Sequence, residues 1–211
     1  MAIKFVGGRL DEEPESYVKR QRSVNTRHSD GSIEHPFERG KINAGLFCQW
    51  MHSQGVRPNE ILVLGCRVGY EMREFINRVP TVEVMGVDII PEFIEKAKTI
   101  SDAVCCDMHE LPFDNDAYQC TFSAQALEHC YNIPKAIDEM VRVTRKYIYL
   151  SLPLESKEKF DENPSHYGWT SNPIGWIELF KPYPNWRMEY ACIPYKNTFD
   201  VLFKYIGREF E

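Results

Sequence analysis

Two glycines, an arginine and an acid follow short apolar runs in the first half of the chain. Gly65, Arg67 and Gly69 follow the run ILVL, and Asp88 ends the run VEVMGVD. A glycine turn lets the backbone approach a ligand, and the start of a helix offers N–H donors to a negative group. An acid at the tip of the next strand is placed to accept hydrogen bonds from ribose hydroxyls. The pattern therefore indicates the first half of a nucleotide-type binding site.

Two histidines are the candidate catalytic bases. His129 follows Glu128 just past a predicted strand, where ligands bind in open α/β sheets. His166 lies beside Tyr167 and Trp169 in the segment after the last predicted parallel strand. An imidazole suits proton removal because its unperturbed pKa is about 6.5. The alternatives are that His129 only anchors its own loop and that the aromatic cluster forms a hydrophobic lid.

Strands and helices alternate along the middle of the chain and must position these side chains. Short apolar runs predict strands at 61–65, 81–88, 102–107, 117–124 and 146–153. Helical periodicity predicts helices at 36–54, 70–79, 91–98 and 133–144. This alternation predicts an α/β fold built on a parallel sheet.

Both ends of the chain lack the regular alternation of strands and helices that the middle has. Residues 1–35 suggest an irregular extension with a basic stretch, either a solvated tail or a lid or arm over an anionic substrate. Residues 155–175 are polar and turn-rich and predict a long loop, and a short helix is predicted at 171–180. Residues 186–195 and 198–207 predict an antiparallel pair of strands. The cations of the basic stretch are Lys19, Arg20, Arg22 and Arg27.

Composition limits the classes of protein to which the chain can belong. With 211 residues, 43% hydrophobic and 27% charged, it has the length and composition of one globular domain. No apolar run is long enough for a transmembrane helix, and the net charge of −6 argues against extensive nucleic-acid binding. Seven cysteines, with Cys105, Cys106 and Cys120 in predicted core strands, suggest buried thiols in a reducing, cytoplasmic setting. We expect no metal site, because no pair of CxxC units exists.

Four segments, in order, resemble the class I, Rossmann-like S-adenosylmethionine-dependent methyltransferases, in their small type-11-like group. The segments are ILVLGCRVG, GVDIIPEFIEKAK, CDMHELPFDNDAYQC and TFSAQALEHCYNIPKAIDEMVRV, within about residues 40–152. The resemblance implies a three-layer α/β sandwich whose mostly parallel, Rossmann-like seven-stranded sheet ends in an antiparallel strand pair. It implies an N-terminal extension at 1–35, a single methyltransferase-like domain at 36–211, and S-adenosylmethionine as the cofactor.

The resemblance also implies roles for individual residues. Gly65, Arg67 and Gly69 would shape the methionine end of the cofactor site, Asp88 with Ile89 would hold the ribose, and Asp107 with Met108 the adenine. Each acid has a structural alternative. Asp88 would serve as a cap for the helix that follows it, and Asp107 as a turn residue before the HELPF segment.

The chain departs from the pattern of this family at two positions of the glycine loop. Val63 stands where the family has an acid that commonly holds the methionine ammonium, and Arg67 replaces the middle glycine. Arg67 would either block the cofactor or pair with its carboxylate, which suits a guanidinium fork. A nicotinamide enzyme is disfavoured, because a GxGxxG fingerprint would need glycine at Tyr70.

The expected function is methyl transfer to an unidentified acceptor, a small or phosphate-bearing molecule. Residues 123–126 read SAQA rather than an NPPY-like tetrapeptide, which disfavours amino-methylation of adenine or glutamine. The alternative is a non-catalytic scaffold or assembly protein with a methyltransferase fold. The sequence leaves the oligomeric state open.

Overall fold

A computed structural model describes residues 4–5, 14–25, 35–163, 165–195 and 197–207 of the chain. Its centre is a seven-stranded sheet in the order β4-β3-β2-β5-β6-β9-β8, with β9 antiparallel to both of its neighbours and the other pairs parallel. The strands are β2 (Glu60–Leu64), β3 (Glu83–Asp88), β4 (Ala103–Cys105), β5 (Tyr118–Ala124), β6 (Thr144–Pro153), β8 (Trp186–Tyr195) and β9 (Thr198–Tyr205). The predicted fold class is confirmed, including the antiparallel pair at the end of the sheet.

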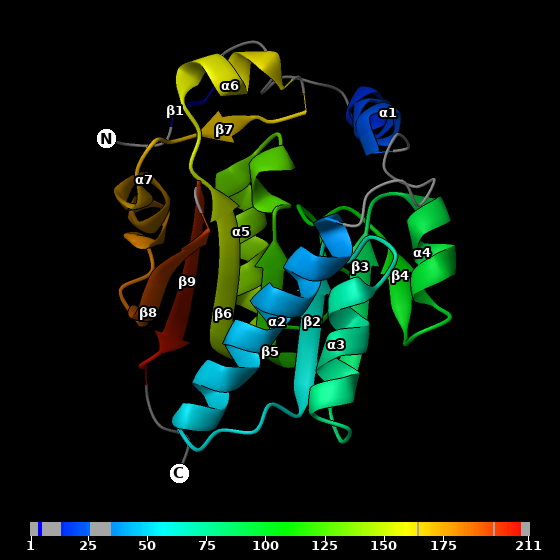
Figure 1. Cartoon of the computed structure of the whole chain (residues 1–211), viewed down its shortest axis with the longest axis vertical. Coiled ribbons are helices and arrows are strands. Elements are labelled where there is room, and N and C mark those ends of the chain that lie inside the picture. Colours follow the sequence, from blue (N-terminus) through cyan, green and yellow to red (C-terminus); the bar gives the residue numbers. More distant parts are fainter. Residues whose placement is uncertain (1–3, 6–13, 26–34, 164, 196, 208–211) are drawn as a thin grey trace.

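Helices cover both faces of this sheet, which gives the predicted three layers (Figure 1). The helices α2 (His35–Ser53), α3 (Tyr70–Arg78) and α4 (Pro91–Ala97) contribute to one hydrophobic core, and α5 (Ile133–Val143) and α7 (Pro173–Ile177) to the other. Along β2, Ile61 and Val63 face the first core, whereas Leu62 and Leu64 face the second. Successive side chains of a strand point to opposite faces, so a strand covered on both sides has the continuous apolar run seen here.

The N-terminal region contains a helix that the sequence did not predict. α1 spans Pro14–Asn25, within the segment expected to be irregular. Its buried side chains are Tyr17 and Gln21, one helical turn apart, and the other described side chains are polar apart from the half-buried Val18. A helix that buries a tyrosine and a glutamine has no aliphatic stripe, so hydrophobic periodicity does not reveal it. Arg27 of the predicted basic stretch lies outside the described residues.

The segment after β6 is also more ordered than the expected long loop. It contains α6 (Lys157–Glu162), whose start is capped by Ser156, and the strand β7 (Gly168–Trp169). β7 pairs antiparallel with β1 (Lys4–Phe5), a partner from the opposite end of the chain. Only that distant partner makes β7 a strand, which is why local sequence patterns do not predict it.

The thiols are less buried than expected. Cys120 is buried in β5, but Cys105 is exposed and Cys106 only half-buried, because β4 is the outermost strand of the sheet. None of the helices in the described part of the chain is long and apolar enough to cross a membrane.

Candidate functional site

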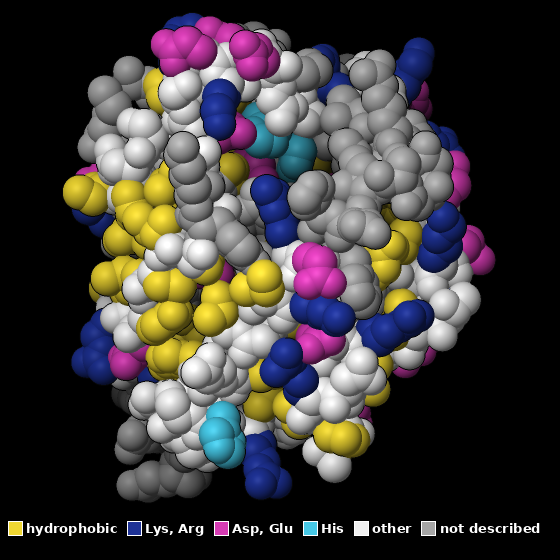
Figure 2. Space-filling model, viewed as in Figure 1, with side chains coloured by type: hydrophobic (Ala, Val, Ile, Leu, Met, Phe, Trp, Pro, Cys, Tyr) yellow, Lys and Arg dark blue, Asp and Glu magenta, His cyan; other side chains and the backbone are white. Residues whose placement is uncertain are grey.

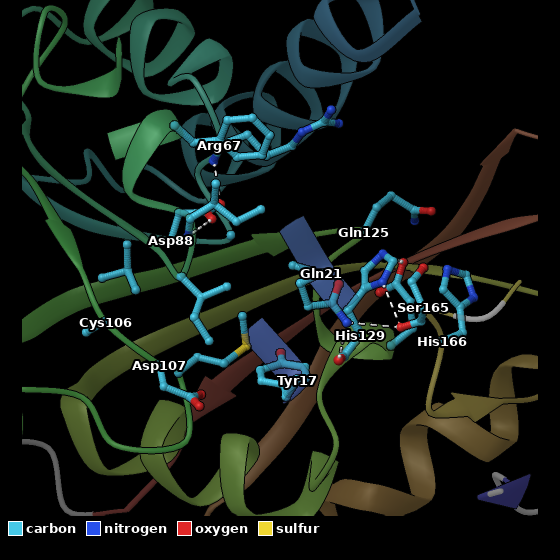
Figure 3. Close-up of a pocket in the computed structure, with 18 of the residues that line it drawn as sticks. Tyr17, Gln21, Arg67, Asp88, Cys106, Asp107, Gln125, His129, Ser165 and His166 are labelled. Atoms are coloured by element: carbon cyan, nitrogen blue, oxygen red, sulfur yellow. Dashed lines mark hydrogen bonds and ion pairs between the residues drawn. The ribbon is translucent and has the colours of Figure 1, made fainter. Parts of the chain in front are cut away.

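A cavity of about 350 Å³ opens at the carboxyl ends of β2, β3 and β5 (Figure 3). This is the edge at which open α/β sheets bind ligands. The candidate residues that line it are Gly65, Arg67, Asp88, Ile89, Asp107, Met108, His129 and His166. Of the predicted site residues, only Gly69 is absent from the wall. It lies at the start of α3, where it shapes the turn.

Backbone geometry explains both glycines of the loop after β2. Gly65 and Gly69 have φ values of 70° and 88°, in the left-handed region that favours glycine. A Cβ on Gly65 would also lie 2.4 Å from the Cβ of Ala126, and one on Gly69 would lie 2.7 Å from the Cδ1 of Ile100. Neither position tolerates a side chain, so both glycines keep the loop close to the following elements.

Asp88 ties the glycine loop to the start of α4. Its Oδ2 accepts a hydrogen bond from the Arg67 amide at 2.9 Å, and its Oδ1 accepts one from the Ile90 amide at 2.9 Å. Burial raises the pKa of the Asp88 carboxyl, and these amides oppose the rise. An ionised carboxylate oxygen can accept more than one hydrogen bond, so this bonding leaves capacity for ribose hydroxyls.

Arg67 occupies the cavity wall instead of the middle glycine of the loop. Its φ of 49° is left-handed, a conformation that costs about 1–2 kcal/mol for a residue with a Cβ. Its guanidinium Cζ lies 5.9 Å from the centroid of the Phe93 ring. Burial has the largest effect on two nearby groups: it raises the pKa of Asp88 and lowers the pKa of His129. The positive charge of Arg67 has a smaller effect and lowers the pKa of both. The Arg67 charge therefore acts on groups at two parts of the cavity.

Asp107 forms the turn that the sequence allowed as an alternative, and it also lines the cavity. Its Oδ1 accepts the His109 amide at 2.9 Å and contacts Nδ1 of the His109 ring. Burial raises the pKa of Asp107, but the hydrogen bonds from His109 outweigh it and hold that pKa below its usual value. Nε2 of His109 accepts the Asn132 amide at 3.2 Å, so Nδ1 carries the ring proton and donates to Asp107. The His109 ring packs on Tyr131 with 3.9 Å between centroids.

The two candidate bases meet at the other end of the cavity. The rings of His129 and His166 lie 4.6 Å apart between centroids, nearly perpendicular to each other. Nδ1 of His129 lies 3.1 Å from the Ser165 carbonyl oxygen, which can only accept, so the lone pair of His129 is on Nε2. Nδ1 of His166 lies 2.7 Å from Oε2 of Glu155.

Glu128 joins these histidines, a role that its sequence position alone did not indicate. Its Oε1 lies 4.0 Å from Nε2 of His129, and its side chain is 1% exposed. Burial raises the pKa of Glu128 to about 7, and burial followed by the charge of His166 lowers the pKa of His129 to about 3. At neutral pH His129 is therefore an uncharged hydrogen-bond acceptor.

Two residues of α1 form part of the cavity wall. Tyr17 and Gln21 line it, and Nε2 of Gln21 lies 3.3 Å from the backbone oxygens of both His129 and Ser165. Tyr17 makes edge-on ring contacts with His109, Tyr131 and Tyr167. No sequence motif marked either residue. Their turn-apart spacing within a basic, polar segment is the one signal that was available.

Comparisons with known proteins show which proteins this chain is similar to. Residues 62–150 match the family model described as a methyltransferase domain. A malonyl-[acyl-carrier protein] O-methyltransferase of Halorhodospira halophila is 33% identical over 95 residues. That match takes in 42% of this chain and 32% of the relative, so the chain spans about a third of the relative's length.

Solved structures share the fold over most of the chain. A Pyrococcus horikoshii protein, PH0226, has a TM-score of 0.69 at 16% identity, with 83% of this chain and 93% of that one covered. Magnesium protoporphyrin IX methyltransferase of Synechocystis, solved with S-adenosylhomocysteine, has a TM-score of 0.65 at 13% identity, with 89% and 93% covered. The plantazolicin methyltransferase BpumL, also solved with S-adenosylhomocysteine, has a TM-score of 0.67 at 14% identity, with 93% and 92% covered.

Proposed function

Because the chain carries a class I, Rossmann-like methyltransferase domain, whose cofactor is S-adenosylmethionine, we propose that it transfers a methyl group to a small-molecule acceptor. The observation that carries the proposal is that one cavity gathers the glycine loop, Asp88, Asp107 and the pair His129 and His166. In this proposal the first three hold the cofactor, and the two histidines contact the acceptor.

The cavity wall fits the parts of the cofactor. In this proposal Gly65 keeps the loop packed against Ala126 at the cavity wall, Asp88 offers carboxylate oxygens to ribose hydroxyls, and Asp107 with the Met108 amide holds the adenine. Arg67 supplies a positive charge for the methionine carboxylate. The methionine ammonium has no acidic partner at position 63, because Val63 is apolar and its side chain is buried in the hydrophobic core. When bound, S-adenosylmethionine supplies a methyl group already activated by its sulfonium.

The residues of this chain then have to hold the acceptor in line with that methyl group. Positioning of this kind can lower a barrier by roughly 7–11 kcal/mol. Nε2 of His129 is placed to accept a hydrogen bond from an acceptor hydroxyl or amine, and His166 is held by Glu155 beside it. We propose these two histidines as the groups that meet the acceptor.

We further propose that α1 is a cover over the site of a catalytic domain at 36–211. Gln21 bonds the backbone beside His129, and Arg22 pairs with Glu92 of α4, so α1 bridges two parts of the rim. Lys19 is exposed on the same helix, which keeps a phosphate-bearing acceptor within the proposal.

Calorimetric titration with S-adenosylmethionine and S-adenosylhomocysteine tests the proposal directly. We expect micromolar binding of at least one of them, and an Asp88→Ala variant should lose at least tenfold in affinity because it removes a charged hydrogen-bond acceptor. The melting temperatures of the variant and the parent protein without ligand separate loss of the ribose contact from collapse of the loop, because Asp88 also accepts the Arg67 and Ile90 amides.

The matched control is Asp102→Ala, which removes an exposed aspartate outside the cavity wall and should bind like the parent protein. A folded parent protein that binds neither compound at millimolar concentration would contradict the proposal. The non-catalytic scaffold alternative would then be favoured.

A further inference from the structure

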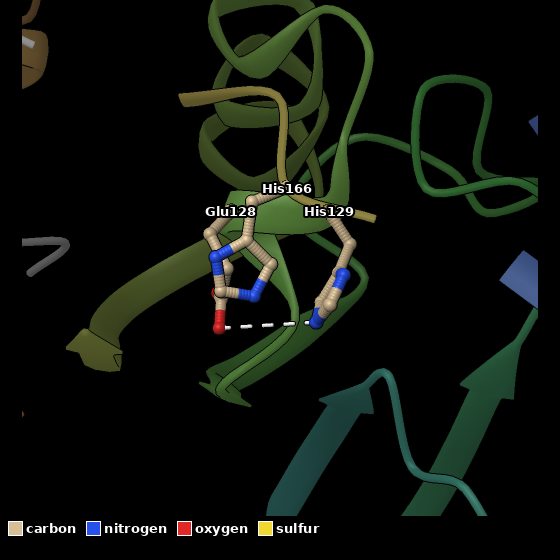
Figure 4. A group of neighbouring side chains, drawn as sticks. All are labelled: Glu128, His129 and His166. Atoms are coloured by element: carbon tan, nitrogen blue, oxygen red, sulfur yellow. Dashed lines mark ion pairs between the residues drawn. The ribbon is translucent and has the colours of Figure 1, made fainter. Parts of the chain in front are cut away.

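Three side chains that can ligate a metal converge at the acceptor end of the cavity (Figure 4). Glu128 and His129 come from the 3₁₀ turn Leu127–His129 after β5, and His166 comes from the segment between α6 and β7. One ligand atom from each, a carboxylate oxygen or a ring nitrogen, lies within 4.8 Å of the other two. The sequence offered no hint of the group, because its members belong to two distant segments.

The orientation of each imidazole is fixed in the way that metal-binding histidines require. Nδ1 of His129 donates to the Ser165 carbonyl oxygen, which directs the lone pair of Nε2 toward Glu128. Nδ1 of His166 lies 2.7 Å from Oε2 of Glu155. An ionised carboxylate has no proton to donate, so Nδ1 is the donor in this contact. Metal-ligating histidines almost always donate their other ring N–H to a carboxylate or a backbone carbonyl, and both kinds of partner are found here.

The carboxylate of Glu128 has a bonding deficit that a cation would fill. Its Oε2 is buried and has no hydrogen-bond partner among the described residues. Its Oε1 lies 4.0 Å from Nε2 of His129, which is too far for a hydrogen bond. A buried polar group without a partner costs free energy, so a ligand is expected to meet this oxygen.

The three ligand atoms would have to move closer together to bind an ion. Metal–ligand bonds of about 2.0–2.2 Å put neighbouring ligand atoms about 3.0–3.5 Å apart. The 4.0 Å gap between Glu128 and His129 would therefore shorten by up to about 1 Å, and a separation of 4.8 Å, the upper limit in this group, by up to about 1.8 Å. His166 would also have to exchange the contact between its Nε2 and the Asn163 amide, now 3.0 Å, for the ion.

We propose that Glu128, His129 and His166 bind a divalent first-row transition-metal ion at the acceptor end of the cavity. Two imidazoles and one carboxylate suit Zn²⁺, Co²⁺ or Fe²⁺ rather than Mg²⁺, which prefers oxygen ligands. Three protein ligands leave coordination positions open. All three ligands line the cavity, and on the proposed function the open positions hold an oxygen atom of the methyl acceptor, which then contacts the ion in place of a direct hydrogen bond to Nε2 of His129.

Cobalt is the most informative probe, because protein-bound Co²⁺ absorbs in the visible range. Protein freed of metal with a chelator would be titrated with Co²⁺ by absorbance and calorimetry, with Mg²⁺ as the comparison ion. We expect one Co²⁺ bound per chain with an imidazole–carboxylate spectrum, and no comparable binding of Mg²⁺. His129→Ala and His166→Ala should each weaken Co²⁺ binding at least tenfold.

His52→Ala is the matched control, because it removes an exposed histidine near the end of α2, outside the cavity wall, and should leave Co²⁺ binding unchanged. Glu128→Gln keeps the shape of the side chain and should also weaken binding, which covers the case in which a histidine variant does not fold. In the parent protein, Co²⁺ should shift and broaden the imidazole NMR signals of His129 and His166.

Absence of Co²⁺ binding to the folded parent protein would overturn the metal site. So would binding that none of the three substitutions weakens. S-adenosylhomocysteine affinity, measured on the same samples, keeps the two proposals apart. Loss of cobalt binding with intact cofactor binding refutes the metal alone, whereas cobalt binding without cofactor binding refutes methyl transfer alone.

Discussion

At the scale of single residues, Arg67 is a clear difference between this site and the family pattern, because it stands in place of the middle glycine of the loop. A glycine at this position would adopt the left-handed backbone without strain, whereas an arginine adopts it at a cost in conformational free energy. The cost is understandable if the guanidinium serves the cofactor, because Val63 leaves the methionine end without an acidic partner. The carboxylate of the methionine moiety then becomes the main anchor at that end.

Substitution of Arg67 tests this role with a pair of ligands. Arg67→Gln should weaken S-adenosylhomocysteine binding about tenfold, because it removes a charge-assisted contact. It should leave the affinity for 5′-methylthioadenosine unchanged, since that compound lacks the carboxylate. Calorimetry with both ligands measures the difference, and Arg73→Gln, at an exposed position of α3, is the control. An equal loss for both ligands would assign Arg67 to the shape of the loop instead.

At the scale of elements, α1 connects the two ends of the cavity. Tyr17 is 3% exposed and packs against the rings of His109 and Tyr131, near Asp107, whereas Gln21 bonds the backbone oxygens of His129 and Ser165. A ligand that fills the cavity would therefore contact α1, and on the proposal that α1 is a cover, these contacts slow its release.

Loss of the Tyr17 ring should loosen this helix. We expect Tyr17→Ala to speed dissociation of S-adenosylhomocysteine about tenfold and to reduce hydrogen-exchange protection across α1. Tyr17→Phe keeps the ring and should behave like the parent protein in both measurements. Stopped-flow displacement gives the dissociation rate, and an unchanged rate in Tyr17→Ala would mean that α1 does not restrict release.

Sequence patterns predicted the sheet far better than the elements that cover its edge. The run ILVLG marked β2 because a strand buried on both faces must be apolar throughout, and Gly65 was marked because its backbone requires glycine. Tyr17, Gln21 and Glu155 carried no such signal, since each acts through a partner distant in sequence. The sequence placed Glu128 and His129 next to each other after a predicted strand. Their contact with His166 depends on the path of the segment between α6 and β7, which the sequence did not predict.

At the scale of the whole molecule, a half-buried carboxyl group makes stability depend on pH. Burial raises the pKa of Glu71 from 4.5 to about 7, although its backbone hydrogen bond and the charge of Arg67 oppose the rise. The folded protein therefore holds a proton that the unfolded chain has lost between these two values. Stability from this group is full below about pH 4.5 and falls as the pH rises to about 7.

Glu71→Gln should remove that dependence. We expect the variant to match the parent protein at pH 4 and to be more stable at pH 8 by about 1–2 kcal/mol, discounted for partial exposure. Urea unfolding at the two pH values measures this difference. Glu83→Gln, at an exposed position, is the control. Equal stabilities of the parent and Glu71→Gln at pH 8 would show that the carboxyl group is better solvated than its position implies.

The return of the chain over the sheet edge, between the end of β6 at Pro153 and the start of β8 at Trp186, has a consequence for how such proteins diversify. The residues proposed for the cofactor lie within the stretch 62–150 that matches the family model, whereas Glu155 and His166 lie in the excursion after it. None of the described residues from 155 to 172 belongs to either hydrophobic core, so this part of the excursion can be exchanged without repacking the core, whereas Trp176 and Phe180 of its later part belong to the core. We therefore expect that related proteins with a different excursion or a different α1 prefer a different acceptor. We expect those that share the sheet to use the same cofactor.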